Sequence, residues 1–165
     1  SAASDVYKRQ RIVAAPTAGA CGVLPAVLVN YQKEKGTADE QIVRALYTAA
    51  GIGQVVAARA YIAGASGGCQ AEIGTASAMA AGALTALGGG TPSQITHAAA
   101  MALKNLLGLV CDPVGGLVEV PCVKRNVIGS VNALSAADMA LAGIISRIPP
   151  DQVINAMREL SLIHI

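Results

Sequence analysis

The chain has 165 residues and a formal net charge of +2, from 12 Lys and Arg against 10 Asp and Glu. A charge this close to zero, without a run of basic residues, argues against a protein that binds nucleic acid through the phosphate backbone. The sequence is rich in Ala and contains 18 Gly but no Phe or Trp, which is typical of helices that pack closely through small side chains. The length suffices for one domain with a hydrophobic core.

The two ends of the sequence do not resemble natural protein. Residues 5–10 (DVYKRQ) and 160–165 (LSLIHI) can be back-translated into DNA sequences that are reverse complements of each other. This DNA is the transposon mosaic end used to prepare sequencing libraries. We therefore predict that residues 1–10 and 160–165 are translated adapter sequence. The natural domain would then be residues 11–159, truncated at its C-terminus.

The elements are predicted from Pro, Gly and the spacing of apolar residues. A turn over 11–22 precedes a helix over 23–35, which Gly36 ends. Thr37 is predicted to cap a second helix, reaching about residue 62, because Glu40 follows three positions later as in a capping box. Further helices are predicted over 69–87, 92–109 and 121–145 and from 149 onward, with 117–120 as a short extended piece.

These elements predict an all-α fold, a single compact helical domain of about six helices. The helix over 69–87 consists mostly of Ala, Gly, Ser and Thr, so its neighbours can approach it from every side. We expect it to be the central helix.

A membrane helix has to be considered, because residues 73–103 contain no Asp, Glu, Lys or Arg. The turn over 87–94 leaves about 15 apolar residues before it, whereas a spanning helix needs about 20. We therefore expect a buried helix of a soluble protein and no membrane partner, with a membrane helical hairpin as the alternative. Four Cys without a close CxxC pair predict reduced thiols in a cytoplasmic protein.

Three cysteines, Cys69, Cys111 and Cys122, each adjoin a Gly- or Pro-containing loop at a predicted helix end. Cys69 and Cys122 would lie at helix N-termini, where free N–H groups and the helix dipole stabilise a thiolate. Three thiolates without a fourth could hold an iron–sulfur cluster with one open iron. Two alternatives remain from spacing alone. The cysteines could be small buried residues of an Ala-rich core, or they could form a zinc site.

Three segments carry a resemblance to a known family. The segments APTAGACGVLPAVL (15–28), SGGCQAEIGTASAMAAG (66–82) and LGLVCDPVGGLVEVPCVKRN (107–126) resemble, in order and spacing, the α chain or α domain of the iron-sulfur-dependent L-serine dehydratases. The resemblance covers nearly all of residues 11–159, and its last segment is the most specific.

The resemblance implies a [4Fe-4S] cluster held by Cys69, Cys111 and Cys122, and no pyridoxal phosphate. It implies deamination of L-serine to pyruvate and ammonia by dehydration, with the open iron as a Lewis acid and a base that removes the α-proton. It further implies a β subunit or β domain as partner, an oligomer, and a place in amino-acid catabolism and gluconeogenesis. The fragment alone would then hold only part of the active site.

Several other side chains are candidates for supporting roles. The loop over 16–22 suits a substrate carboxylate held by backbone N–H groups, and Lys124 or Arg125 could balance cluster charge. Glu72 is expected to accept N–H groups at its helix start, and Cys21 is expected to pack rather than to ligate. His97, the one histidine outside the predicted adapter, lies mid-helix among alanines and is expected to be packed or exposed. The catalytic base is not identified, and the substrate-binding candidates are Thr17, Gly19, Ser66 and Asn126.

Two other functions remain open. One is an L-cysteine desulfidase-type lyase of the same superfamily, in which sulfide leaves instead of water. The other is a non-catalytic helical module whose cysteines bind zinc or nothing. The spacing of Cys111 and Cys122 and the loop between them favour the serine enzymes.

Overall fold

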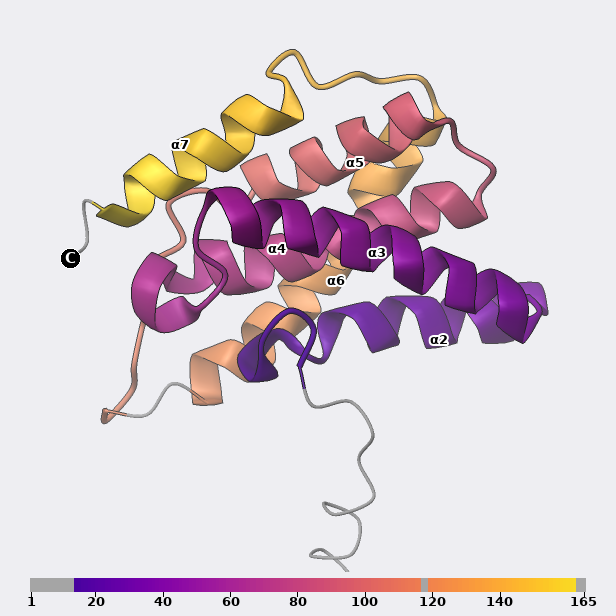
Figure 1. The fold of residues 1–165 in the computed structure, drawn as a ribbon. Helices are drawn as coiled ribbons and strands as arrows, with labels where there is room; N and C mark the ends of the chain where they lie inside the picture. Colours follow the sequence, from indigo (N-terminus) through magenta and orange to yellow (C-terminus); the bar gives the residue numbers. More distant parts are fainter. Residues whose placement is uncertain (1–13, 117–118, 163–165) are drawn as a thin grey trace, which may run out of the picture.

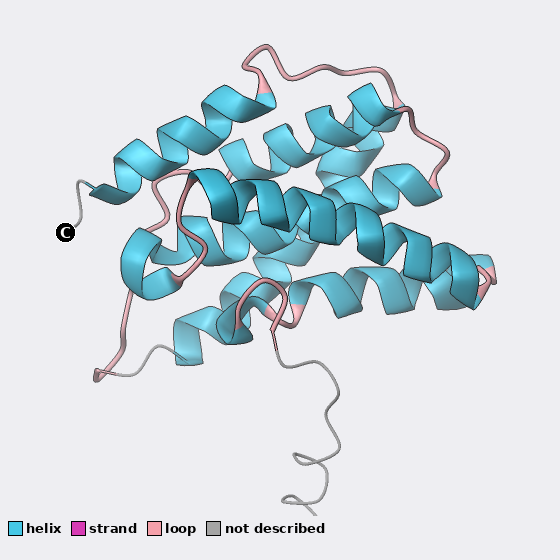
Figure 2. Cartoon of the chain, viewed as in Figure 1, coloured by secondary structure: helices cyan, strands magenta, loops and turns pink. Residues whose placement is uncertain are grey.

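The computed structural model describes residues 14–116 and 119–162 (Figure 1). This part of the chain forms one short 3-10 turn and six α-helices and contains no β-strand (Figure 2). The all-α prediction is confirmed, including the number of helices. The elements are η1 (Ala18–Ala20), α2 (Val23–Lys35), α3 (Asp39–Arg59), α4 (Gly64–Leu87), α5 (Pro92–Lys104), α6 (Glu119–Leu141) and α7 (Pro150–Leu162).

Helix α4 is the centre of the fold, as its composition predicts. It contacts α2, α3, α5, α6 and α7, and it runs through the middle of the bundle behind α3 (Figure 1). Every residue from 73 to 85 is buried. Three of these residues, Thr75, Ser77 and Thr85, carry hydroxyl groups. Thr85 Oγ1 donates to the Ala81 carbonyl within α4, so its polar group is satisfied at no cost to packing.

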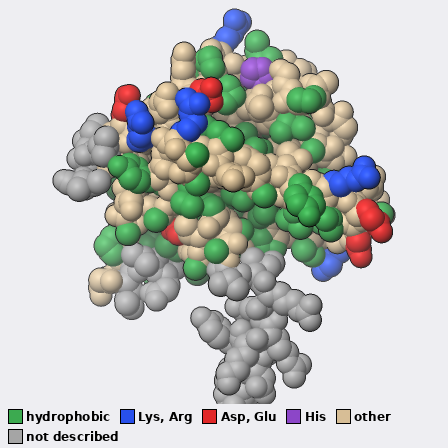
Figure 3. Space-filling model, viewed as in Figure 1, with side chains coloured by type: hydrophobic (Ala, Val, Ile, Leu, Met, Phe, Trp, Pro, Cys, Tyr) green, Lys and Arg blue, Asp and Glu red, His purple; other side chains and the backbone are tan. Residues whose placement is uncertain are grey.

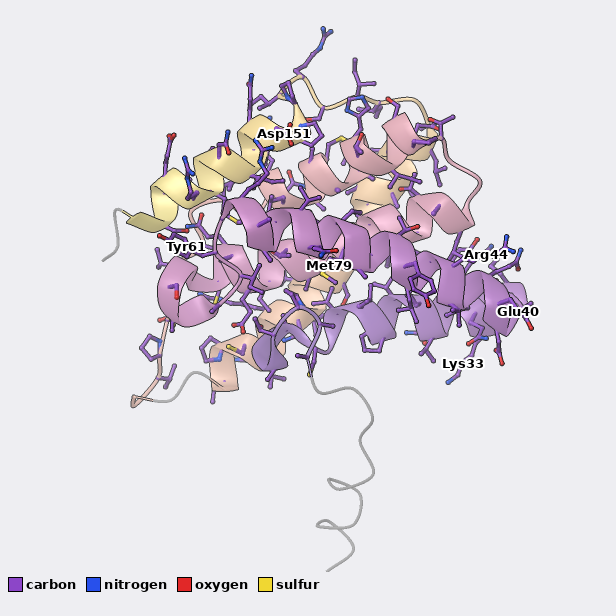
Figure 4. All side chains as sticks on the ribbon, viewed as in Figure 1. Lys33, Glu40, Arg44, Tyr61, Met79 and Asp151 are labelled. Atoms are coloured by element: carbon purple, nitrogen blue, oxygen red, sulfur yellow. The ribbon has the colours of Figure 1, made fainter. Side chains whose placement is uncertain are left out.

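Small residues set how closely the other helices approach α4. A Cβ at Gly82 would lie 2.2 Å from the Ile52 Cδ1 of α3, and one at Gly129 of α6 would lie 2.8 Å from the Ile73 Cγ2. Met79, labelled in Figure 4, fills the crossing of α3 and α4, where a Cβ at Gly53 would lie 2.8 Å from its Sδ. Packing this close replaces the large aromatic side chains that the sequence lacks.

Polar side chains join the helices that flank α4. The Asn132 Nδ2 of α6 donates to Ser77 Oγ and to the Ala102 carbonyl of α5, both at 2.8 Å. At the start of α5, Thr91 and Gln94 form a capping box, and Gln94 Nε2 also donates to the Ala140 carbonyl of α6 at 3.0 Å. The relative positions of α4, α5 and α6 are therefore held by hydrogen bonds as well as by packing.

Several predicted boundaries are wrong. Helix α3 ends at Arg59 rather than at about residue 62. Helix α4 begins at Gly64 rather than at residue 69, α5 ends at Lys104 rather than 109, and α6 spans Glu119–Leu141 rather than 121–145. The predicted extended piece over 117–120 lies partly outside the described residues, and its last two residues belong to α6.

The predicted cap of α3 is also wrong. Ala38 is the N-cap, and no side chain caps the helix. Gln32 Nε2 instead donates to the Thr37 carbonyl at 3.3 Å and to Asp39 Oδ1 at 2.6 Å, which ties the end of α2 to the start of α3. Thr37 and Glu40 have the spacing of a capping box, but the N-cap of the helix is one residue later, at Ala38.

Charged side chains lie on the periphery. Lys33, Glu40 and Arg44 gather where α2 ends and α3 begins (Figure 4). On the face shown in Figure 3, the few charged side chains lie in small groups, and hydrophobic and uncharged polar groups cover most of the rest. None of the helices within the described ranges combines the length and apolar character needed to cross a bilayer.

Candidate metal centre

A break in α4 positions Cys69. Gly68 has φ 73° and ψ −175°, which separates the first turn of α4 from the long helical part that begins at Cys69. Only Gly adopts this conformation at low cost. A Cβ at Gly68 would also lie 3.1 Å from the Leu109 carbonyl oxygen and 3.3 Å from the Val110 Cα. The break therefore lets the segment before Cys111 approach the start of the buried helix.

Gln70, the residue after Cys69, holds the segment before Cys111 in place through hydrogen bonds. The Gln70 backbone N–H donates to the Leu109 carbonyl at 2.8 Å, and Gln70 Oε1 accepts from the Gly108 N–H at 2.8 Å. The Gln70 side chain is fully buried and also donates to Ser161 Oγ of α7 at 3.3 Å. Cys69 itself is 2% exposed. One cysteine is thus held rigidly at the junction of α4, α7 and the loop that carries Cys111.

Arg125 of α6 connects Cys69 to the same loop. Its Nη1 donates to the Val110 carbonyl at 2.8 Å and to Cys69 Sγ at 3.0 Å, and its Nη2 lies 3.7 Å from Asp112 Oδ2. The Arg125 side chain is 14% exposed, whereas its neighbour Lys124 is exposed. Of the two basic residues considered from the sequence, Arg125 is the one that faces the thiols.

Replacing Arg125 by Ala is expected to lower the free energy of unfolding by about 1–2 kcal/mol, because the Val110 carbonyl and the Cys69 thiol lose their donor. Urea unfolding followed by circular dichroism measures this change. Lys124→Ala is the matched control, and we expect it to change stability by less than about 0.5 kcal/mol because Lys124 is exposed. Equal effects of the two substitutions would contradict a specific role for Arg125.

Cys122 lies in the first turn of α6, as predicted. Burial raises the pKa of the Cys122 thiol, and the nearby Cys69, Glu72 and Cys111 raise this pKa further. Negative charge on these groups would therefore be mutually unfavourable unless a cation joined them.

Cys111 lies in the loop between α5 and α6 and is exposed. With Ser66, Gly68 and Ser161 it lines a small cleft of about 90 Å³. Ser66, a candidate substrate contact, therefore lies next to one of the candidate ligands.

Cys21 differs from the other three cysteines, because it is half-buried after η1 and shares no described hydrogen bond with them. His97 is half-buried in α5, and its Nδ1 is buried without a partner among the described residues.

Asn126 joins the loop over 16–22 to α6. Its Nδ2 donates to the carbonyls of Gly19 and Cys122, both at 2.7 Å, and its Oδ1 accepts from the Gly22 N–H at 3.1 Å. Both ends of the amide are thus occupied by backbone groups. Three of the four substrate candidates, Thr17, Gly19 and Asn126, therefore belong to one hydrogen-bonded unit with the start of α6 and α4.

Glu72 is the residue that the sequence reasoning misjudged. Its carboxylate accepts from the Thr17 hydroxyl and not, among the described hydrogen bonds, from N–H groups at a helix start. It also lies against Gly19 and Gly64, where a Cβ would come within 2.7 Å and 2.9 Å of its oxygens. The sequence contains one indication of this position of Glu72, since a residue three positions after Cys69 lies on the same helix face as Cys69.

The arrangement of these side chains does not suit a single ion. Among the described residues, no group of three or more His, Cys, Asp or Glu side chains could hold one metal ion. Ligands of one zinc ion have sulfur atoms about 4 Å apart, given metal–sulfur bonds of about 2.3 Å. Ligands of a four-iron cluster bind different irons and lie farther apart.

Comparison with known proteins identifies the family. Residues 8–164 match the family model described as "Serine dehydratase alpha chain". The chain is 58% identical over 149 residues to the "Probable L-serine dehydratase, alpha chain" of Bacillus subtilis (strain 168), covering 90% of this chain and 50% of the relative. The protein of the same name from Latilactobacillus sakei is 59% identical over 149 residues, covering 90% of this chain and 71% of that protein.

A third relative is the "L-serine dehydratase TdcG" of Escherichia coli (strain K12). It is 47% identical over 151 residues, which are 90% of this chain and 33% of the relative. The chain thus spans about half of the B. subtilis relative and a third of the E. coli one. Because the family model matches nearly the whole sequence, the chain belongs to the serine dehydratase alpha chain family.

Proposed function

We propose that this chain is the cluster-binding part of an L-serine dehydratase, a lyase that converts L-serine to pyruvate and ammonia without pyridoxal phosphate. The observation that carries the proposal is the set of contacts around Cys69. Arg125 and Cys122 of α6 and the loop before Cys111 all meet the start of the long part of α4. The names of the relatives support the choice of substrate.

The residues present fit an iron–sulfur cluster. Cys69, Cys111 and Cys122 would hold it, since thiolates are its usual ligands and three of them leave one iron without a protein ligand. Gly68 lets the backbone that leads to Cys111 come close to the residue before Cys69, which brings these two cysteines to the same end of the bundle. When bound, the cluster supplies a Lewis acid for the substrate hydroxyl group.

The other residues around the thiols have supporting tasks in this proposal. Arg125 keeps the Cys69 sulfur oriented and supplies positive charge beside it. Gln70 holds the loop that carries Cys111, and Asn126 fixes the loop over 16–22 against the first turns of α6. No base is assigned within this chain, and we propose that the β subunit or β domain supplies it.

The remaining parts of the proposal concern the whole protein. The natural domain is residues 11–159, with residues 1–10 and 160–165 as adapter sequence. The complete enzyme is a cytoplasmic oligomer that acts in amino-acid catabolism, and L-serine and the β part are its partners. Ser161 packs in the core, but it does so as part of the segment that we assign to the adapter.

Anaerobic reconstitution tests the function. The complete enzyme, with its β part, is expected to gain a broad absorbance near about 400 nm with iron and sulfide and then to form pyruvate from L-serine. The same assay with L-cysteine is the comparison. A preference for L-cysteine would support the desulfidase alternative. A protein that binds zinc but gains no absorbance near about 400 nm would contradict the cluster assignment.

A further inference from the structure

Glu72 is a half-buried carboxylate at the same end of the bundle as the thiols. It follows Cys69 by three residues, so both side chains leave the same side of α4. Gly19 lies against Glu72 and is joined through the Asn126 amide to the Cys122 carbonyl, so Glu72 and Cys122 lie at the same end of the bundle. Two loops enclose the carboxylate, one with Thr17 and Gly19 and the other with Gly64.

Glycines make this enclosure possible. A Cβ at Gly19 would lie 2.7 Å from Glu72 Oε1, and one at Gly64 would lie 2.9 Å from Oε2. Any side chain at either position would displace the carboxylate. The two loops therefore lie against its oxygens through bare backbone.

The carboxylate has acceptor capacity to spare. An ionised carboxylate offers about four acceptor positions, and the Thr17 hydroxyl is the one described donor. The ion pairs within the described ranges are Arg59 with Asp151 and Arg125 with Asp112, so neither involves Glu72. A partly desolvated carboxylate of this kind is stabilised by a cationic donor.

The distribution of charge around the site also favours a cationic partner for Glu72. The iron of a bound cluster would offset the charge of its cysteine ligands, whereas Glu72 has no cationic partner among the described ion pairs. Arg125 already contacts Cys69, Val110 and Asp112. An amino acid carries a positive ammonium group next to its carboxylate. A substrate bound beside the thiols would thus supply the cation that the side chains lack.

We propose that Glu72 binds the α-ammonium group of the substrate and thereby selects amino acids over hydroxy acids of the same shape. This inference rests on the proposed function. Thr17 is a positioning residue, because its hydroxyl group holds Oε1 in place, whereas Oε2 accepts no described hydrogen bond. Glu72 takes no part in bond breaking in this assignment.

The test compares two ligands in the complete, reconstituted enzyme. L-Serine has the ammonium group, and 3-hydroxypropionate keeps the hydroxyl and carboxylate groups but lacks it. Glu72→Gln is expected to raise the KM for L-serine by about 10- to 150-fold, the effect of losing a hydrogen bond between charged groups. The Kd of 3-hydroxypropionate, measured by titration calorimetry, should stay within about twofold.

Two further variants serve as controls. Glu34→Gln removes an exposed carboxylate of α2 and should leave both constants unchanged. Glu72→Asp keeps the charge on a shorter side chain and should retain part of the preference for L-serine. A preference as low in Glu72→Asp as in Glu72→Gln would count against recognition by charge.

The other outcomes overturn the assignment. A fall in kcat with an unchanged KM would make Glu72 a proton acceptor, and equal weakening of both ligands or loss of the cluster absorbance would make it a structural residue. Wild-type enzyme that neither gains the absorbance nor deaminates L-serine would remove the proposed function as well. An active wild type with an unaffected Glu72→Gln variant would overturn only the role of Glu72.

Discussion

Replacing Cys69 by Ser is expected to abolish cluster binding and to lower serine deamination at least about 1000-fold, since the Lewis acid contributes several kcal/mol. Cys69 is 2% exposed and follows the fixed break at Gly68, so no neighbouring side chain can take over its position. A hydroxyl group is a poor ligand for iron in such clusters. Iron content and absorbance near about 400 nm measure the loss directly.

Cys21→Ser is the matched control for this prediction. Cys21 is half-buried at the end of η1, and no described hydrogen bond links it to the other thiols. We expect this variant to keep its iron and its activity, and Cys111→Ser and Cys122→Ser to behave like Cys69→Ser. Full iron content in Cys69→Ser, or loss of iron in Cys21→Ser, would show that the ligand set is wrong.

Gly68→Ala is expected to lower the free energy of unfolding by about 2–4 kcal/mol and to reduce iron retention. The φ of 73° with ψ of −175° is strained for any residue with a side chain. The new Cβ would also lie 3.1 Å from the Leu109 carbonyl oxygen, which accepts the Gln70 N–H. Urea unfolding measures the stability, and iron analysis reports on the site.

The control for Gly68→Ala is Gly51→Ala in α3. Gly51 is exposed within a helix, and a Cβ there would meet no atom within 4 Å. Alanine at this position should stabilise the protein by about 0.5–1 kcal/mol, because it restricts the unfolded chain and favours helix. If Gly68→Ala were as stable as Gly51→Ala, the close approach of the two chain segments would be disproved.

The helices could be predicted because their signals are local. The apolar spacing, the Pro residues at helix starts and the small residues of α4 all act within one element. The boundaries were less predictable, since Gly64–Gly67 reads as a turn but forms the first turn of α4. The break at Gly68 is accompanied by a hydrogen bond from Gln70 to the Leu109 carbonyl, a partner far along the chain that local signals do not reveal.

The placement of Cys69 and Cys122 near the starts of helical segments could be predicted, but the surroundings of the candidate site could not. Each cysteine adjoins a Gly or Pro signal that is visible in the sequence. Which of Lys124 and Arg125 faces inward depends on how α6 is rotated against α4, and that rotation is set by contacts such as Gly129 with Ile73. The surroundings of Glu72 likewise depend on two loops that approach it only in the folded chain.

The close packing around α4 also determines which sequences the fold can accept. Residues 73–85 have neighbours on every side, so an added methyl group has no open direction in which to shift. The outer side of α3, with Tyr47 and Val55 exposed, has no such restriction. Random substitution should therefore be tolerated on the outer side of α3 but not at most positions from 73 to 85, which makes the segment with the smallest side chains the least tolerant of variation.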